Sequence, residues 1–273
     1  MCTAFVSIDP GSAVPVLLLA VRDEYTDRQW LPPGCHWPSR PAITGGLDLH
    51  AGGTWLAVTG CREPVTACLL NGFGPRVPRH RRRSRGEIPL VAASGQRIDR
   101  PERYDPFHLI LARPGGARVL SWSGNTLQDS ELPTGLSIVL NNGLGGQAGA
   151  SGCPPHIHAT MAARTAHFRA RLQAVARPEP AFGPPDVAWG QWLPIARGDG
   201  LPPDDPAALI RRLEPPGGRV WGTVSLSLVA LAPGRVRYDF GTAEHVRPLT
   251  HILLKSVPIT TDLQTPGVDG DIG

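Results

Sequence analysis

The sequence predicts an α+β protein in which antiparallel sheets are covered by helices. Most apolar runs occur in pairs separated by short turns, which is typical of β-hairpins. Segments with helical signals lie between these pairs and after them. In a parallel sheet, single strands would alternate with helices, so the paired runs favour antiparallel sheets.

Four hairpins are expected. The first joins residues 3–8 to residues 14–21 through Asp9-Pro10-Gly11-Ser12, a strong turn signal. The other three join residues 54–59 to 65–70, 107–112 to 117–122, and 219–230 to 235–240. A short strand at 136–140 and an edge strand within 251–259 complete the sheets.

Helices are expected at three places. Ser84-Arg85-Gly86-Glu87 matches a capping box ahead of the apolar residues 88–93. Apolar residues recur at helical spacing over 159–176. Asp204-Asp205-Pro206 predicts the start of a helix over 207–213. No internal repeat or linker divides the chain, so residues 1–273 are predicted to form a single domain.

Composition restricts the class of protein. The 27 Lys+Arg against 23 Asp+Glu give a net charge of +4, too small to indicate nucleic-acid binding. The arginine-rich run at 76–85 contains no aromatic residue and is interpreted as a solvated loop. The apolar stretch at 15–20 is too short to cross a bilayer, and no export signal precedes it, so no membrane span is expected.

The cysteines favour a reducing compartment. They are odd in number and lack the spacing of a disulfide framework or a zinc ribbon, and they are Cys2, Cys35, Cys61, Cys68 and Cys153. We therefore expect a cytoplasmic protein.

Cys153, His156 and His158 match no standard zinc pattern, so no metal site is expected there. The segment 143–148 has the relaxed dinucleotide spacing but continues into glycines and prolines, which predicts a loop.

The first two dozen residues carry the clearest chemistry. If the initiator Met1 is removed, Cys2 presents both a thiol and a free α-amine. An α-amine has a reference pKa of roughly 7.7–8.0 and can accept the proton of the thiol. Pairing within the first hairpin would carry Arg22 and Asp23 back toward Cys2, although such charged residues at a strand end can also form an ordinary solvated turn. Asn71 leaves a strand end beside a glycine, from which its amide can point into a site.

Several motifs resemble the NRDE family, also called the transport and Golgi organisation protein 2 family. Over the first third of the chain they are Met1-Cys2, Arg22-Asp23-Glu24, Gly46-Leu47-Asp48, Gly52-Gly53-Thr54-Trp55-Leu56 and Ser84-Arg85-Gly86-Glu87. Tyr104-Asp105-Pro106-Phe107-His108-Leu109 and Gly222-Thr223 are weaker matches further along. The resemblance implies a four-layer αββα sandwich of the N-terminal nucleophile hydrolase type, with Cys2 in the nucleophile position. That superfamily includes bile-salt hydrolases and penicillin V acylases, which cleave amide bonds.

The chain departs from the family pattern at three positions. Val21 replaces the asparagine of the Asn-Arg-Asp-Glu motif, and Ile138 replaces an asparagine in a Gly-Leu-Ser-Asn motif. Val224 stands where a Gly-Thr-Arg pattern places an arginine that related hydrolases use. Asn71 or Asn142 is expected to supply the missing amide function.

The leading hypothesis is a cysteine amidohydrolase that acts on a small acyl-amide without a cofactor. Cys2 attacks the carbonyl, its α-amine transfers the proton, Asp23 holds the amine and Arg22 favours the thiolate. Asn71, with Asn142 as the second candidate, donates a hydrogen bond to the oxyanion.

Two alternatives remain. In the first, the same fold serves a non-catalytic haem- or lipid-handling protein, as the family resemblance implies, with Cys2, His50 and His108 as candidate axial ligands. In the second, the fold has lost activity and serves as a scaffold, because fold does not fix function. The sequence leaves the substrate and the oligomeric state open.

Overall fold

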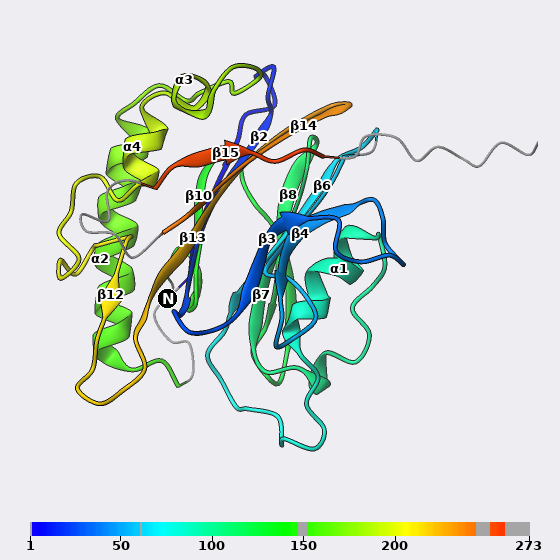
Figure 1. Cartoon of the computed structure of the whole chain (residues 1–273), viewed down its shortest axis with the longest axis vertical. Coiled ribbons are helices and arrows are strands. Elements are labelled where there is room, and N and C mark those ends of the chain that lie inside the picture. Colours follow the sequence, from blue (N-terminus) through cyan, green and yellow to red (C-terminus); the bar gives the residue numbers. More distant parts are fainter. Residues whose placement is uncertain (1, 61, 147–151, 244–251, 260–273) are drawn as a thin grey trace, which may run out of the picture.

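Two antiparallel sheets pack face to face in the computed structural model, which describes residues 2–60, 62–146, 152–243 and 252–259 (Figure 1). The first sheet has the described order β11 (Gly143–Leu144), β10 (Gly135–Leu140), β1 (Thr3–Ile8), β2 (Val16–Tyr25), β13 (Trp221–Ala232), β14 (Arg235–Thr242) and β15 (Leu254–Ser256), with β12 (Arg212–Leu213) beside β13. The second has the described order β3 (Trp30–Gly34), β4 (Ile43–Asp48), β5 (Leu56–Thr59), β6 (Val65–Asn71), β7 (Phe107–Arg113), β8 (Gly116–Trp122) and β9 (Leu127–Glu131).

Helices cover the outer face of each sheet, as Figure 1 shows. The first sheet is covered by α2 (Pro155–Gln173), α3 (Pro185–Trp189) and α4 (Trp192–Ala196). The second is covered by α1 (Ile88–Ala93), which follows the short 3-10 helix η1 (Arg85–Glu87), while a second 3-10 helix, η2 (Pro101–Arg103), precedes β7. The order helix, sheet, sheet, helix confirms the expected αββα sandwich. None of the described helices is long and apolar enough to cross a membrane.

The central strands are apolar on both faces. Along β1, Phe5 packs toward the helices, whereas Ala4 and Val6 pack between the two sheets. Along β2, Leu17 and Leu18 divide in the same way, because successive side chains of a strand point to opposite faces. The start of β1 is therefore held from both sides.

The four predicted hairpins are present, and each pairs antiparallel. Ser84 caps η1, since its Oγ accepts a hydrogen bond from the amide of Gly86, while the Glu87 carboxylate accepts hydrogen bonds from Arg83 and Tyr104. Helix α2 begins at Pro155, four residues before the predicted helix, and ends at Gln173.

The helix predicted over residues 207–213 is wrong. Asp205 Oδ1 accepts a hydrogen bond from the amide of Ala207 at 2.7 Å, which closes a turn. The chain then runs beside β13, where the amide of Arg211 donates to Thr223 Oγ1 at 3.0 Å and β12 pairs with the start of β13. The sheet thus uses the backbone groups that a helix would need.

Glycines bring two loops of the second sheet into backbone contact. The amide of Thr54 donates to the Gly86 carbonyl oxygen at 2.8 Å, and a Cβ atom on Gly53 would lie 2.2 Å from that oxygen. A Cβ atom on Gly46 would lie 2.2 Å from the ring of Trp55. These positions require glycine because another backbone or a ring occupies the space of a side chain.

Gly53→Ala is expected to destabilise the protein by about 1–3 kcal/mol, because the clash with Gly86 is with backbone and cannot be relieved by a rotamer change. Urea unfolding followed by fluorescence measures the change. Gly115→Ala is the matched control, since nothing lies within 4 Å of a Cβ atom there. Equal unfolding midpoints for the two variants would contradict the close contact.

Candidate active site

A pocket of about 480 Å³ lies where β1 begins and where β4 and β6 end. Cys2 and Asn71 are among its lining residues. Charged side chains make up much of the described lining, and they are Arg22, Asp23, Glu24, Arg28, Asp48, Arg82, Arg83, Arg85 and Asp105. The pocket therefore presents a strongly polar surface around one thiol.

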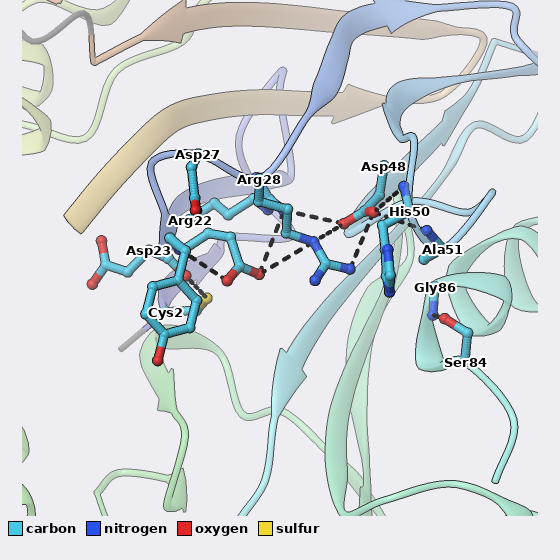
Figure 2. Close-up of polar contacts among 12 residues, drawn as sticks. Cys2, Arg22, Asp23, Asp27, Arg28, Asp48, His50, Ala51, Ser84 and Gly86 are labelled. Carbon is cyan, nitrogen blue, oxygen red and sulfur yellow. Dashed lines mark hydrogen bonds and ion pairs between the residues drawn. The ribbon is translucent and has the colours of Figure 1, made fainter. Parts of the chain in front are cut away.

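Strand pairing brings Arg22 and Asp23 to Cys2, as the first hairpin predicts. Thr3 pairs with Val21, so the residues that follow Val21 continue past the start of β1. Cys2 Sγ lies 3.7 Å from the backbone oxygen of Asp23, to which it donates a weak hydrogen bond (Figure 2). On the neighbouring strand β13, Thr223 Oγ1 donates to Asp23 Oδ1 at 2.7 Å, which fixes the carboxylate.

Arg22 is held in place by charges and by a ring. Its Nη2 lies 3.3 Å from Asp48 Oδ2 and 3.7 Å from Glu24 Oε2. Its guanidinium carbon lies 4.3 Å from the centre of the Trp55 ring, a cation–π arrangement. Only 6% of Arg22 is exposed, and burial lowers its pKa, while Glu24, Cys2 and Asp48 counteract that shift. A buried positive charge thus lies beside the thiol.

Asp48 joins the charged network to the backbone. Arg28 donates to its two carboxylate oxygens at 2.6 and 3.1 Å, and the amides of His50 and Ala51 donate to Oδ1 at 3.1 and 3.0 Å (Figure 2). Burial alone would raise the pKa of Asp48, but the hydrogen bonds from Arg28 and Ala51 bring it below its ordinary value. Asp48 is therefore ionised at neutral pH and compensates Arg22 and Arg28.

The Cys2 thiol is a weak acid in this setting. Burial raises its pKa, and the Asp23 carboxylate adds to that effect. The amino group of Met1, the hydrogen bond to the Asp23 backbone and the charge of Arg22 act in the opposite direction but do not outweigh burial in the chain that retains Met1. The thiol is accordingly protonated at neutral pH, and any reaction at sulfur needs a nearby base.

Asn71 is connected to both sheets at the end of β6. Its backbone oxygen accepts a hydrogen bond from Asn141 Nδ2 at 2.6 Å, in the turn after β10. The backbone oxygen of Asn141 lies 3.3 Å from His108 Nε2, and His108 Nδ1 lies 2.8 Å from Ser121 Oγ. These contacts fix the backbone of Asn71, while its side chain is exposed at the pocket.

This network predicts a pH-dependent stability. Burial lowers the pKa of His108 from 6.5 to about 4, although the Asn141 carbonyl opposes the shift. Below pH 6.5 the unfolded chain binds a proton that the folded chain does not, so stability is complete above pH 6.5 and falls as the pH approaches 4. The expected loss is up to about 3 kcal/mol.

Urea unfolding at a series of pH values between 7 and 4 measures this loss. His108→Gln is expected to flatten the dependence, whereas His80→Gln, which changes an exposed histidine, is expected to keep it. The same pH slope in wild type and His108→Gln would rule out His108 as the source.

Four of the five residues predicted for the site line this pocket: Cys2, Arg22, Asp23 and Asn71. Asn142 is not among the described residues of the lining. It is buried after β10, and its Nδ2 lies 3.3 Å from Nδ1 of His158 in α2. Asn71 is thus the better-placed of the two amides.

Of the three haem ligands considered from the sequence, two reach the described lining of the pocket. His50 lines the pocket with Cys2, but His108 is not among the described lining residues and contacts Ser121 and Asn141 through its ring nitrogens. A haem macrocycle buries a large apolar surface, whereas charged side chains make up half of the described lining. The residues present do not fit a haem.

Arg28, Asp48 and Arg85 also line the pocket, although none of them was predicted to belong to the site. Asp48 and Arg85 belong to motifs that carry the family resemblance, Gly46-Leu47-Asp48 and Ser84-Arg85-Gly86-Glu87. Membership in these motifs could have identified the two residues as members of the site. Arg85 Nη1 donates to the Pro106 carbonyl at 2.7 Å, and burial lowers the pKa of Arg85. Within the described ranges Arg85 forms no ion pair, although the nearby Asp105 carboxylate opposes the effect of burial on its pKa, and Arg85 lines the pocket.

The departures from the family pattern lie outside the described lining. Val21 and Ile138 are buried in the core between the first sheet and the helices. Val224 is buried at an irregularity of β13, where the register with β2 shifts between Thr223 and Ser225. These three side chains serve packing.

The chain thus folds as an antiparallel αββα sandwich in which Cys2 directly precedes the central strand β1. The sequence model of the family described as Transport and Golgi organisation 2 matches residues 1–147. This match covers more than half of the chain, and the chain belongs to that family.

The solved structures that match the chain include two hydrolases of other organisms. One is a mutant of the conjugated bile acid hydrolase from Clostridium perfringens, with 11% identity, a TM-score of 0.43, and coverage of 98% of this chain and 100% of that chain. The other is the Caenorhabditis elegans ortholog of N-acylethanolamine-hydrolyzing acid amidase, with 10% identity, a TM-score of 0.46, and coverage of 86% and 94%. No curated protein matches the sequence.

Proposed function

We propose that this protein is a cysteine amidohydrolase that cleaves a small acyl-amide. The observation that supports the proposal is the convergence of a thiol, a buried arginine, a fixed carboxylate and an exposed amide on one pocket, namely Cys2, Arg22, Asp23 and Asn71. The pocket is large enough for a small molecule, at about 480 Å³.

The reaction begins with proton transfer from the thiol. Once Met1 is removed, the α-amine of Cys2 accepts the Sγ proton, which the raised thiol pKa makes necessary. The thiolate attacks the carbonyl carbon, and the electron pair of the C=O bond moves to oxygen. The Asn71 amide donates a hydrogen bond to that oxyanion, while Arg22 stabilises the negative charge near sulfur.

The intermediate then breaks down in two steps. The C–N bond breaks as the α-ammonium of Cys2 returns its proton to the leaving nitrogen, which releases an amine and leaves a thioester on Cys2. Water, deprotonated by the α-amine, attacks the thioester and releases a carboxylic acid and the free thiol. Asp23, fixed by Thr223, orients the amine throughout.

The charges of the lining favour a substrate with an anionic group. Arg22 and Arg28 share Asp48, and Arg82 lies 3.0 Å from Asp105. Arg85 interacts with Asp105 only at longer range and forms no ion pair within the described residues, so a carboxylate of the substrate can bind its guanidinium. We therefore expect amides that carry a carboxylate to react faster than matched neutral amides.

Mass spectrometry and a substrate panel test the proposal. The intact mass should show loss of Met1, and an acyl-amide electrophile should label Cys2 faster than Cys35, which is exposed. A panel of acyl-amides, each with and without a carboxylate on the amine side, should reveal turnover. Retention of Met1 together with labelling that follows exposure alone would refute the mechanism.

A further inference from the structure

Helix α2 places an arginine on its buried face. Met161, Phe168 and Leu172 on this face belong to the apolar core against the first sheet, and Arg164 lies among them with 0% exposure. A buried arginine is costly unless its donors are satisfied. Arg164 Nη1 donates to Thr3 Oγ1 at 2.8 Å, and Nη2 donates to the Ala208 carbonyl.

Thr3 connects this arginine to the pocket. It is the residue directly after Cys2, and its side chain points to the helices while Cys2 packs toward the space between the sheets. Thr3 pairs with Val21 of β2 and Leu140 of β10, so it is the first residue of β1 held on both edges. A contact that fixes Thr3 also fixes the backbone from which the thiol projects.

Arg164 also influences the carboxylate beside Cys2. Burial lowers the pKa of Arg164, and the Asp23 carboxylate opposes that shift, which indicates that Arg164 and Asp23 interact. Arg211, the next cation in this region, donates through Nη2 to the Asp205 carbonyl at 2.9 Å. Arg164 thus interacts with Asp23, and Arg211 is a second cation close enough to act on Arg164.

We propose that Arg164 is a positioning residue for Cys2: through Thr3 it fixes the start of β1, and it places a buried positive charge behind the thiol and Asp23. The inference rests on the proposed function only for its effect on turnover, because the reactivity of the thiol can be measured without a substrate. It assigns a role in the site to a helix that contributes no residue to the described lining.

A buried positive charge near a thiol favours the thiolate, so its loss makes the thiol less reactive at a given pH. The charged or titratable groups that act on Cys2 come from several elements. They are the amino terminus, Arg22 and Asp23 of β2, Cys68 of β6, Arg85 of η1 and Arg164 of α2. Arg164 can be changed without altering the pocket surface, which makes it a clean probe.

The test is the rate of Cys2 alkylation by iodoacetamide between pH 6 and 10, resolved by peptide mass spectrometry. Arg164→Met is expected to raise the pH midpoint of alkylation by about one unit. Arg164→Lys, which keeps the charge, is expected to recover at least half of that shift. Arg169→Met is the control, because Arg169 lies on the same helix and donates to the Leu136 carbonyl instead.

An unchanged midpoint in folded Arg164→Met, or an equal shift in Arg169→Met, would overturn the inference. If Arg164→Met does not fold, Thr3→Val and Thr3→Ser replace it. Thr3→Val removes the acceptor of the Arg164 hydrogen bond and should raise the midpoint, whereas Thr3→Ser keeps it and should not. Equal midpoints for these two variants would also overturn it.

The outcomes separate the two proposals. A midpoint shift in Arg164→Met with no acyl-amide turnover by the wild type would support the positioning role and count against the hydrolase. Turnover by the wild type with an unchanged alkylation midpoint in Arg164→Met would support the hydrolase and contradict the positioning role.

Discussion

Replacing Cys2 with alanine is expected to lower acyl-amide hydrolysis by roughly 10⁴-fold or more, because no thioester can then form. The fold should be unaffected. The Cys2 side chain contributes one weak hydrogen bond, at 3.7 Å to the Asp23 backbone, so the cost in stability should be below about 1 kcal/mol. Initial rates on the best substrate of the panel, with thermal unfolding of each variant, measure both effects.

Two further variants make this result specific. Cys2→Ser keeps an oxygen nucleophile beside the same α-amine and should retain a small fraction of the rate. Cys153→Ala removes a thiol that packs against the helical side of the first sheet and should retain the wild-type rate. Hydrolysis by Cys2→Ala at more than a tenth of the wild-type rate would place the chemistry elsewhere.

Removing the Asn71 side chain is expected to lower kcat by about 10²–10³, the usual effect of losing one oxyanion donor. KM should change little, because the hydrogen bond strengthens only as charge develops on the carbonyl oxygen. Stability should be kept, since Asn141 binds the backbone of Asn71 and not its amide. Asn71→Ala, assayed over a range of substrate concentrations, separates the two parameters.

Asn142→Ala decides between the two amides considered from the sequence. Asn142 packs against His158, so its loss should affect the turn after β10 more than turnover. Asn125→Ala, in an exposed turn, controls for the substitution itself. A large loss of kcat in Asn142→Ala with a normal kcat in Asn71→Ala would reverse the assignment.

The sequence predicted the part of the site that depends on local pairing. Cys2, Arg22 and Asp23 lie in one hairpin, so alternation and a turn signal suffice to bring them together. Asn71 followed from its position at a strand end. The positions of these four residues follow from strand geometry, because side chains alternate between the two faces of a strand every second residue.

The rest of the site depends on contacts between distant loops. Asp48 and Arg85 meet at the pocket because the backbones at Gly53 and Gly86 touch, and no local pattern encodes that approach. The predicted helix at 207–213 is wrong for a related reason. The helix propensity of this segment was outweighed by the hydrogen bond that Thr223 Oγ1 accepts from the backbone amide of Arg211.

The fourfold coordination of Asp48 by arginines and backbone amides has a consequence for how the pocket binds. The groups that donate to Asp48 come from β2, the turn after β2 and the loop after β4, and they are already hydrogen-bonded in the folded chain, so little reorientation remains to occur when a ligand arrives. Such preorganisation lowers the reorganisation energy of charge formation relative to water, whose dipoles must turn during the reaction. If a ligand binds here, selectivity is expected to depend on how well its charges match those already arranged around Asp48.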